Sequence, residues 1–507
     1  MNGKTTLAIL LILLMGFSFF LRTFPLTEVH YWDPCVYLQN AEIILGNAEG
    51  GYELDFRPPF LPLFIAFLNL FWHSPYMAQI GVGFLSVLGA IPLFLLLKRK
   101  FNSYVAFIGF LVFCFSPTLL LEAKGILTDN VALSFFVFAV YFLDCSFDFR
   151  GMKKRKNFFI ILALLFLVLS ILTKFTYILG VIFFFVYLVF KKAAFQTYFR
   201  YLVFGTLFIL PYLIWNFFSF GNPFYAFLKG REVVSHSPSS PLFFYFDNLD
   251  YFSELTWIIG LFLLASFLVF SIYKRIRKSS KKALNSSQKP ALYKSRPFVL
   301  ASFLWSVLMF LALSSMAHKE MRYSFPLFFV FIVLSSAGYF YFPFLFIEKT
   351  SSKVEPKRRL FYLLFVIFVA CFYAFQSIVL LNSNYYGLEN NYPVDFIEVS
   401  KWLSEMDDDE PIYALTHYPM LNYYSNRSVI PAKPRNYSKI LLNCSREAFR
   451  SFNITEDRGY FVSFPEGYDE KTRVSDAFFS ECDYFEEIFR SGNEGDYGVV
   501  YRFDMND

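Results

Sequence analysis

The stretch FFIILALLFLVLSILTKFTYILGVIFFFVYLVF, residues 158–190, is apolar almost throughout and holds one charged side chain, Lys174. As a single helix it would extend about 50 Å, whereas the hydrocarbon core of a bilayer is about 30 Å thick. Two shorter spans with a tight turn at Lys174 fit a membrane better. The stretch therefore predicts a helical membrane protein whose chain turns back at this lysine.

The composition of the chain agrees with this interpretation. Of its 507 residues, 56% are apolar, 22% are aromatic and only 17% are charged, which is typical of proteins that cross a membrane several times. The first apolar segment lacks a small-residue cleavage site, so we expect an uncleaved anchor rather than a secretory signal. About 11 segments have nearly the length of a bilayer crossing, roughly 20 residues: 7–24, 77–97, 104–121, 130–147, 158–173, 175–190, 201–218, 255–273, 297–314, 323–347 and 360–381.

Basic side chains are concentrated in every second loop between these segments. Loops of this kind remain in the cytoplasm by the positive-inside rule. The amino terminus is therefore expected inside and the carboxyl-terminal region outside. The basic loops contain residues 98–100, 150–156, 191–192, 274–296 and 349–359.

One further apolar stretch, PPFLPLFIAFLNLFW at residues 58–72, tests this topology. As a helix it reaches only about 22 Å, less than the thickness of the hydrocarbon core. If it crossed, every later basic loop would lie outside. We therefore predict a juxtamembrane or re-entrant helix within one large external loop, residues 25–76.

The net charge of +6 hides two regions of opposite sign. Residues 384–507 hold 12 Lys and Arg against 23 Asp and Glu, a net charge of −11, which leaves 34 against 17, or +17, for residues 1–383. The acidic region also contains an amphipathic helix pattern and short strand patterns, PIYALTH, GYFVSF and YGVVYRF. We predict a transmembrane domain at 1–383 and a small extracytoplasmic α/β domain at 384–507. No soluble basic face is left to bind nucleic acid.

The six cysteines lack the spacing of metal ligands. Cys444 and Cys482 lie in the acidic region, where they would form a disulfide in an oxidising compartment or remain two free thiols. The acidic run DDDE at residues 407–410 is interpreted as a solvated turn rather than a metal site.

Ionisable side chains on the predicted outer side come from loops that are distant in the sequence. For Lys124, Lys174 or Arg231 taken alone, anchoring of a helix end among lipid headgroups is an equally good explanation. Asp129 fits that explanation less well, because an apolar span follows it directly and a buried charge there costs about 2.5 to 3.5 kcal/mol, although an acidic residue also favours a helix amino terminus. The segment HKEMR places four ionisable residues beside another span, which favours a functional role. The set comprises Asp33, Arg57, Glu122, Lys124, Asp129, Lys174, His318, Lys319, Glu320 and Arg322.

Such a set suits one kind of chemistry. A transferase that uses a sugar linked to a lipid phosphate needs cations for the phosphate, which gains negative charge as the glycosidic bond breaks. It also needs a carboxylate that accepts the proton of the acceptor hydroxyl.

The order of the motifs resembles that of the GT-C glycosyltransferases over about residues 1–340. The nearest groups are the dolichyl-phosphate-mannose protein mannosyltransferases of family 39 and the bacterial aminoarabinose transferase of lipid A. The resemblance is carried by an external Asp after the first span (HYWDPC), a basic residue before a proline-rich helix (RPPFLPLF), and the elements LTDNVAL, LTKF and HKEMRY.

The resemblance implies roles for the residues at matching positions. Asp33 would be the general base, and Asp129 a second site carboxylate that positions the acceptor or pairs with a neighbouring cation. The donor phosphate would be bound first by Arg57 and Lys174, together with His318, Lys319 and Arg322. Pro34 stands where the family often has a second acid, so no metal site is expected. No WWD motif is present, which argues against transfer of an oligosaccharide to asparagine.

The function implied is that of an inverting membrane glycosyltransferase of the cell membrane or the endoplasmic reticulum. It would move one mannose-like sugar, a hexosyl or pentosyl group, from a polyprenyl or dolichyl phosphate to a glycan, lipid or protein acceptor, without an organic cofactor. The alternative is a transporter or flippase of lipid-linked sugars. Against it, the sequence shows no inverted repeat, and its ionisable residues gather on one side of the membrane. A catalytically dead scaffold is a third possibility, which the presence of both Asp33 and Asp129 disfavours.

Overall fold

The computed structural model describes the chain in several ranges and divides it into two compact units. The first unit comprises Met1–Leu26, Asp55–Leu61 and Gln79–Ser383, and the second comprises Thr27–Leu54, Pro62–Ala78 and Asn384–Asp507. The second unit thus combines the acidic carboxyl-terminal region with most of the loop predicted at 25–76. The described residues are 3–26, 32–48, 55–148, 153–236, 241, 244–247, 291–316, 319–347, 375, 395–432, 450, 454–464, 479–493 and 496–505.

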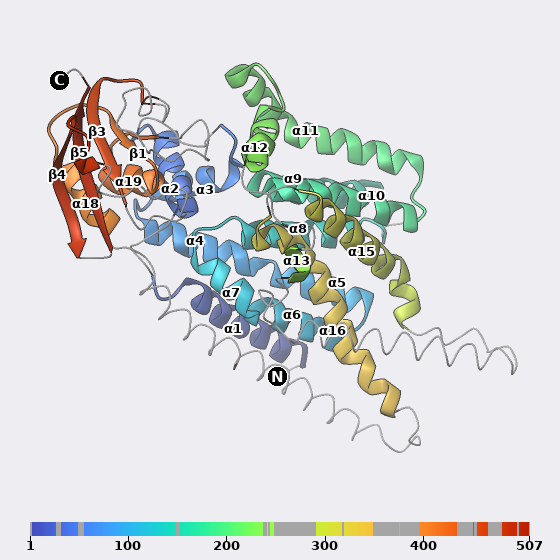
Figure 1. Ribbon diagram of the computed structural model, residues 1–507. Helices are drawn as coiled ribbons and strands as arrows, with labels where there is room; N and C mark the ends of the chain where they lie inside the picture. Colours follow the sequence, from blue (N-terminus) through green and yellow to red (C-terminus); the bar gives the residue numbers. More distant parts are fainter. Residues whose placement is uncertain are drawn as a thin grey trace, which may run out of the picture. The chain divides into compact units, whose positions relative to one another are not determined.

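The first unit is helical, as predicted (Figure 1). Within the described residues, six helices are long and apolar enough to cross a membrane, or seven if the bent pair α6 and α7 forms one span. The predicted spans 255–273 and 360–381 lie outside the described residues. The elements of this unit are α1 (Gly3–Thr23), most of α4 (Pro75–Leu88), α5 (Ala90–Lys100), α6 (Ser103–Phe115), α7 (Pro117–Lys124), α8 (Asp129–Cys145), α9 (Lys153–Thr173), η1 (Phe175–Leu179), α10 (Gly180–Phe190), α11 (Phe195–Phe220), α12 (Tyr225–His236), α13 (Phe244–Asp247), α15 (Ala291–Ser314), η3 (Met321–Ser324) and α16 (Phe325–Ile347).

The break predicted at Lys174 is confirmed, and the segment after it, Phe175–Phe190, is an apolar helix shorter than the helices that are long enough to cross a membrane. The helix α9 ends at Thr173, Lys174 adopts an extended conformation, and the 3-10 turn η1 then leads into α10. The apolar stretch at 58–72 forms α3 (Phe60–Asn69), which has only 10 residues. A helix of that length is too short to cross the hydrocarbon core.

Aromatic side chains from several helices fill the core of the first unit. The ring of Phe136 on α8 lies 5.2 Å from that of Trp305 on α15 and 5.5 Å from that of Phe329 on α16. The Trp305 indole donates a hydrogen bond of 2.8 Å to the Leu179 carbonyl of η1. Aromatic residues bury large apolar areas, and their polar atoms require partners. This cluster therefore joins α8, η1, α15 and α16 around one centre.

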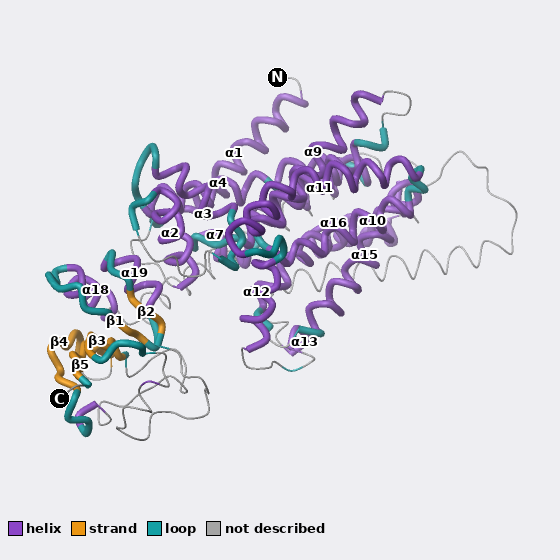
Figure 2. Tube along the Cα trace, turned by 90° about the horizontal axis from the view of Figure 1, so that it is seen from above, coloured by secondary structure: helices purple, strands orange, loops and turns teal. Residues whose placement is uncertain are grey.

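The second unit contains a five-stranded mixed sheet with strand order β2-β1-β3-β5-β4. β1 pairs in parallel with both β2 and β3, whereas β5 is antiparallel to β3 and β4. The three predicted strand patterns are found in β1, β3 and β5 (Figure 2, orange). The elements of this unit are α2 (Trp32–Leu45), most of α3, α18 (Asp395–Ser404), β1 (Ile412–Ala414), α19 (Tyr418–Ser425), β2 (Val429–Pro431), β3 (Arg458–Ser463), β4 (Phe485–Asn493) and β5 (Asp496–Asp504).

Alternate residues of the strands serve two different cores. Tyr460 and Val462 of β3 pack with residues of α2, α18 and α19, whereas Phe461 between them packs on the opposite face with Phe479 and Tyr501. This is the two-residue period of a strand that is covered on both sides. Because both faces of these strands are buried, their sequences are apolar at nearly every position. The same packing shows that α2 is one of the helices that cover one face of the sheet.

Two polar features of the second unit concern a cysteine and the acidic turn at residues 407–410. Cys482 is buried and disulfide-bonded, with a partner outside the described residues.

In the acidic turn, Asp408 accepts a hydrogen bond from the Tyr460 hydroxyl, and Glu410 lies 3.5 Å from Arg458. Burial and the bond to Asp408 raise the pKa of Tyr460 to about 12. Part of the turn therefore packs against the sheet instead of being fully solvated.

Candidate active site

Asp129 and Lys174 form a buried ion pair in the first unit. The Lys174 ammonium donates to the Asp129 carboxylate, and the two side chains are only 11% and 1% exposed. Asp129 is the first residue of α8, where a negative charge is stabilised by the helix dipole. Removal of either partner would destabilise the fold, because the other charge would remain buried without compensation.

The packing of α8 and α9 explains why these two residues meet. The two helices are antiparallel neighbours, so the start of α8 lies beside the end of α9. The Ser170 hydroxyl of α9 donates 2.8 Å to the Ala132 carbonyl of α8, one turn inside the pair. Because Lys174 follows α9 in an extended conformation, its side chain can reach back to the amino terminus of α8.

A third element, the turn before α16, closes around the lysine. The Lys174 ammonium lies 3.5 Å from the Arg322 carbonyl oxygen and 5.6 Å from the centre of the Tyr323 ring. A cation over an aromatic face is attracted by the electrons of the ring. The elements LTDNVAL, LTKF and HKEMRY, predicted to share one side of the membrane, thus meet in space.

The Arg322 side chain is paired as well. Its Nε donates to the carboxylate of Glu320, which also accepts a 3.3 Å hydrogen bond from the Tyr323 hydroxyl. The Glu320 carbonyl in turn accepts a 3.3 Å bond from the Tyr245 hydroxyl of α13. The cluster therefore contains two cations, Lys174 and Arg322, each beside a carboxylate.

A buried arginine, Arg22, connects the start of α8 to neighbouring helices. Arg22 of α1 is fully buried, and its guanidinium donates 2.6 Å to the Phe113 carbonyl at the end of α6. In a continuous helix that carbonyl would accept from residue 117, which is a proline without an N–H. Arg22 also lies 3.4 Å from the Leu119 carbonyl, which accepts a 2.8 Å bond from Asn130, the residue after Asp129. Arg22 thus links the break between α6 and α7 to the start of α8.

The other predicted phosphate-binding residues have different surroundings. Arg57 lies in the first unit, on a segment whose Asp55 is 3.5 Å from the Tyr225 hydroxyl of α12. Lys319 is 5% exposed and immediately precedes the Glu320 of the cluster. His318 lies outside the described residues.

Asp33 belongs to the second unit. It lies in the first turn of α2 and is 7% exposed. The neighbouring Trp32 ring packs edge-on against Tyr418 of α19, with 4.7 Å between the ring centres. Asp33 therefore lies in the large loop predicted at 25–76, on a helix that packs with the sheet domain and buries its carboxylate.

Sequence reasoning missed Arg22, Asn130 and Tyr323. An arginine late in an apolar span is costly and is usually functional, so the position of Arg22 was a usable signal. Asn130 and Tyr323 lie directly beside the predicted site residues Asp129 and Arg322, but no local pattern distinguishes them. Within the described part of the chain, no three His, Cys, Asp or Glu side chains are grouped as metal ligands.

The fold was compared with solved structures. ArnT from Cupriavidus metallidurans in the apo state matches with a TM-score of 0.69 and 12% sequence identity, over 100% of this chain and 99% of that chain. The chain has the GT-C fold. Neither a protein-family model nor a curated protein matches the sequence.

Two further GT-C structures match over most of the chain. The oligosaccharyltransferase of Archaeoglobus fulgidus in the apo form has a TM-score of 0.64 and 14% identity, over 98% of this chain and 74% of that one. ArnT bound to undecaprenyl phosphate has a TM-score of 0.63 and 12% identity, over 99% and 98%. The likeness therefore extends over both units, and at these identities it is a likeness of fold.

Proposed function

We propose that the chain is an integral membrane glycosyltransferase that moves a single, mannose-like sugar from a polyprenyl or dolichyl phosphate to an acceptor on the extracytoplasmic face. The observation that carries this proposal is the fold, which is shared over the full chain with ArnT, a protein solved with undecaprenyl phosphate. The Archaeoglobus oligosaccharyltransferase, AglB, was solved with a dolichol-phosphate and an inhibitory peptide. A lipid phosphate is thus the ligand shared by both neighbours.

The proposed reaction is a single displacement with inversion. The acceptor hydroxyl oxygen attacks the anomeric carbon, and the bond between that carbon and the phosphate oxygen breaks. The hydroxyl proton passes to the carboxylate of Asp33, which acts as the general base. The electron pair of the broken bond remains on the lipid phosphate, which leaves as a monoester with one more negative charge.

The cations of the first unit would stabilise that charge. A preorganised cation acts most strongly where charge develops and water is excluded. Lys174 is buried and held in place by Asp129, so Asp129 acts in this scheme as a positioning residue. Arg57, Lys319, Arg322 and His318 complete the proposed phosphate site.

The assignment of Asp33 is tested by Asp33→Asn. We expect loss of transfer with normal expression and membrane insertion, because the amide cannot accept the proton. Asp409→Asn, an exposed acid of the same unit, is the matched control and should retain turnover. Near-normal turnover of Asp33→Asn would exclude Asp33 as the base.

The proposed activity itself is tested in detergent, where transport is impossible. Purified protein is incubated with labelled polyprenyl-phosphate sugars and candidate acceptors, and products are identified by mass. We expect donor consumption with a gain of one sugar on the acceptor. Movement of intact donor across vesicles without any consumption in detergent would favour a flippase instead.

A further inference from the structure

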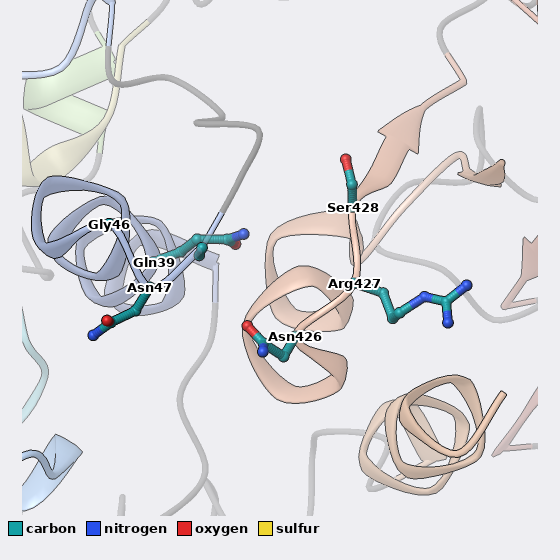
Figure 3. A pocket seen from close by; sticks show the side chains of 7 residues that line it. Gln39, Gly46, Asn47, Asn426, Arg427 and Ser428 are labelled. Carbon is teal, nitrogen blue, oxygen red and sulfur yellow. The ribbon is translucent and has the colours of Figure 1, made fainter. Parts of the chain in front are cut away.

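A pocket of about 370 Å³ lies within the second unit, between the carboxyl-terminal end of α2 and the turn that joins α19 to β2. One side is formed by Gln39 and residues 46–48, and the other by residues 426–428 (Figure 3). The volume falls within the range of small-molecule pockets, roughly 300 to 1,000 Å³. None of these residues has a part in the proposed transfer reaction.

Gln39 is the most informative residue of this pocket. Its side chain extends from α2 toward the turn that carries Asn426, whose amide is turned back toward α2 (Figure 3). Gln39 is only 6% exposed, and its carboxamide makes no hydrogen bond to another of the described residues. Buried amides in native proteins nearly always have a partner. The pocket therefore contains a donor and an acceptor that are held in place by packing and directed at its interior.

The charged groups around the pocket are engaged elsewhere. Arg427 points away from α2 (Figure 3) and donates 2.9 Å to the Met406 carbonyl as well as to that of Asp408. The Glu42 carboxylate on α2 accepts 2.9 Å from Asn47 and 2.8 Å from Asn69. The side chains directed across the pocket are thus the neutral amides of Gln39 and Asn426, and Ser428 also lines it.

We propose that this pocket binds a neutral, hydroxyl-rich ligand, namely a sugar residue or the end of a short glycan. A carboxamide donates and accepts at once, as a sugar hydroxyl does, so Gln39 and Asn426 can each pair with hydroxyls in both directions. An anionic ligand would require a cation directed into the pocket, and Arg427 is bound to carbonyls instead. The site does not rest on the transfer reaction, and each can fail without the other.

The test is saturation-transfer NMR on the full chain in detergent, with methyl mannoside, methyl glucoside, methyl galactoside and N-acetylglucosamine as probes. The protein is expressed in a host without asparagine-linked glycosylation, because residues 426–428 form a sequon. We expect weak binding of at least one neutral sugar, on the order of millimolar. Gln39→Leu should weaken it about tenfold, since a buried hydrogen-bonding group is lost.

Two variants guard against a folding artefact. Asn426→Gly removes the facing amide but tolerates the left-handed backbone at φ 53°, and it should also weaken binding. Gln196→Leu makes the same chemical change as Gln39→Leu at an exposed site of α11 and should bind like the wild type. The proposal is overturned if no neutral sugar binds, if glucuronate or inorganic phosphate competes better than every neutral sugar, or if folded Gln39→Leu and Asn426→Gly both bind normally.

Discussion

Lys174 is the residue at which sequence and structure are most closely connected. The sequence marks it as the one charge in a long apolar run, and the structure shows how that charge is tolerated, through Asp129, a carbonyl and an aromatic face. A buried pair of this kind contributes little net stability compared with an apolar pair. Removal of one partner is nevertheless destabilising, because the other charge is left buried and unpaired. Stability and catalysis can therefore be separated by mutation.

The single variant Asp129→Asn should be destabilised by about 3 to 5 kcal/mol, because it leaves the Lys174 ammonium buried without its carboxylate. The double variant Asp129→Asn/Lys174→Met removes both charges and should regain most of the stability, yet it should not transfer sugar. Thermal unfolding in detergent and the transfer assay measure the two effects. Glu232→Gln, in an exposed pair with Lys229, should change stability by less than about 0.5 kcal/mol. Wild-type turnover in the double variant would remove Lys174 from the phosphate site.

A second residue, His417 of the sheet domain, should make stability dependent on pH. It is 2% exposed, and burial lowers its pKa from the usual 6.5 to about 4. Between these values the unfolded chain binds a proton that the folded chain does not. Stability is therefore complete above pH 6.5 and falls as the pH drops toward 4, by up to about 3 kcal/mol.

Hydrogen exchange of β1 and β3 in the full chain at pH 7 and pH 5 measures this loss. His417→Asn is a suitable comparison, because asparagine tolerates the left-handed backbone of this residue, φ 61°, and cannot titrate. Protection in the variant should change less between the two pH values. An equal change in both proteins would show that other groups dominate.

At the scale of elements, the break between α6 and α7 is the feature that most affects the site. Pro117 begins α7 and cannot donate to the Phe113 carbonyl, so α1 supplies a donor from Arg22. The same guanidinium reaches the Leu119 carbonyl, which is shared with Asn130 beside the ion pair. We therefore expect a substitution of Arg22 in α1 to perturb the start of α8.

Arg22→Met keeps most of the side-chain volume but removes these donors. Each buried carbonyl left without a partner costs about 1 to 3 kcal/mol, so we expect a clear fall in the unfolding temperature. Transfer by the remaining folded protein should also fall as α8 loses a support. Arg200→Met on α11, where the guanidinium donates to Asn157, is the control. Equal unfolding temperatures for the two variants would contradict the role given to Arg22.

At the scale of the whole molecule, two units are built from interleaved parts of one chain. The loop between the first two predicted spans contributes α2 to the sheet domain, and Cys482 of that domain is disulfide-bonded. Disulfides persist in oxidising compartments. This supports the proposal, drawn first from the basic loops, that the sheet domain lies outside the cytoplasm.

That topology is tested by labelling with a membrane-impermeant maleimide. Lys401→Cys lies on an exposed position of α18, and Lys154→Cys lies on an exposed position at the start of α9. In intact cells, we expect labelling of the first variant above the wild-type background and of the second only after permeabilisation. The reverse pattern would invert the proposed orientation.

By itself the sequence determined most of the apolar spans among the described residues, the break at Lys174, the short helix after Arg57 and three strands of the sheet. Each depends on a local period or on the cost of placing polar groups in lipid, and both can be read within a short window. Only the tertiary structure decided that Asp129 neutralises Lys174, that Arg22 completes the broken helix, and that α2 packs with the sheet. Lys174 and Asp129 are 45 positions apart in the sequence, and Arg22 and Phe113 are 91 positions apart. The packing of helices, not any local pattern, brings these residues together.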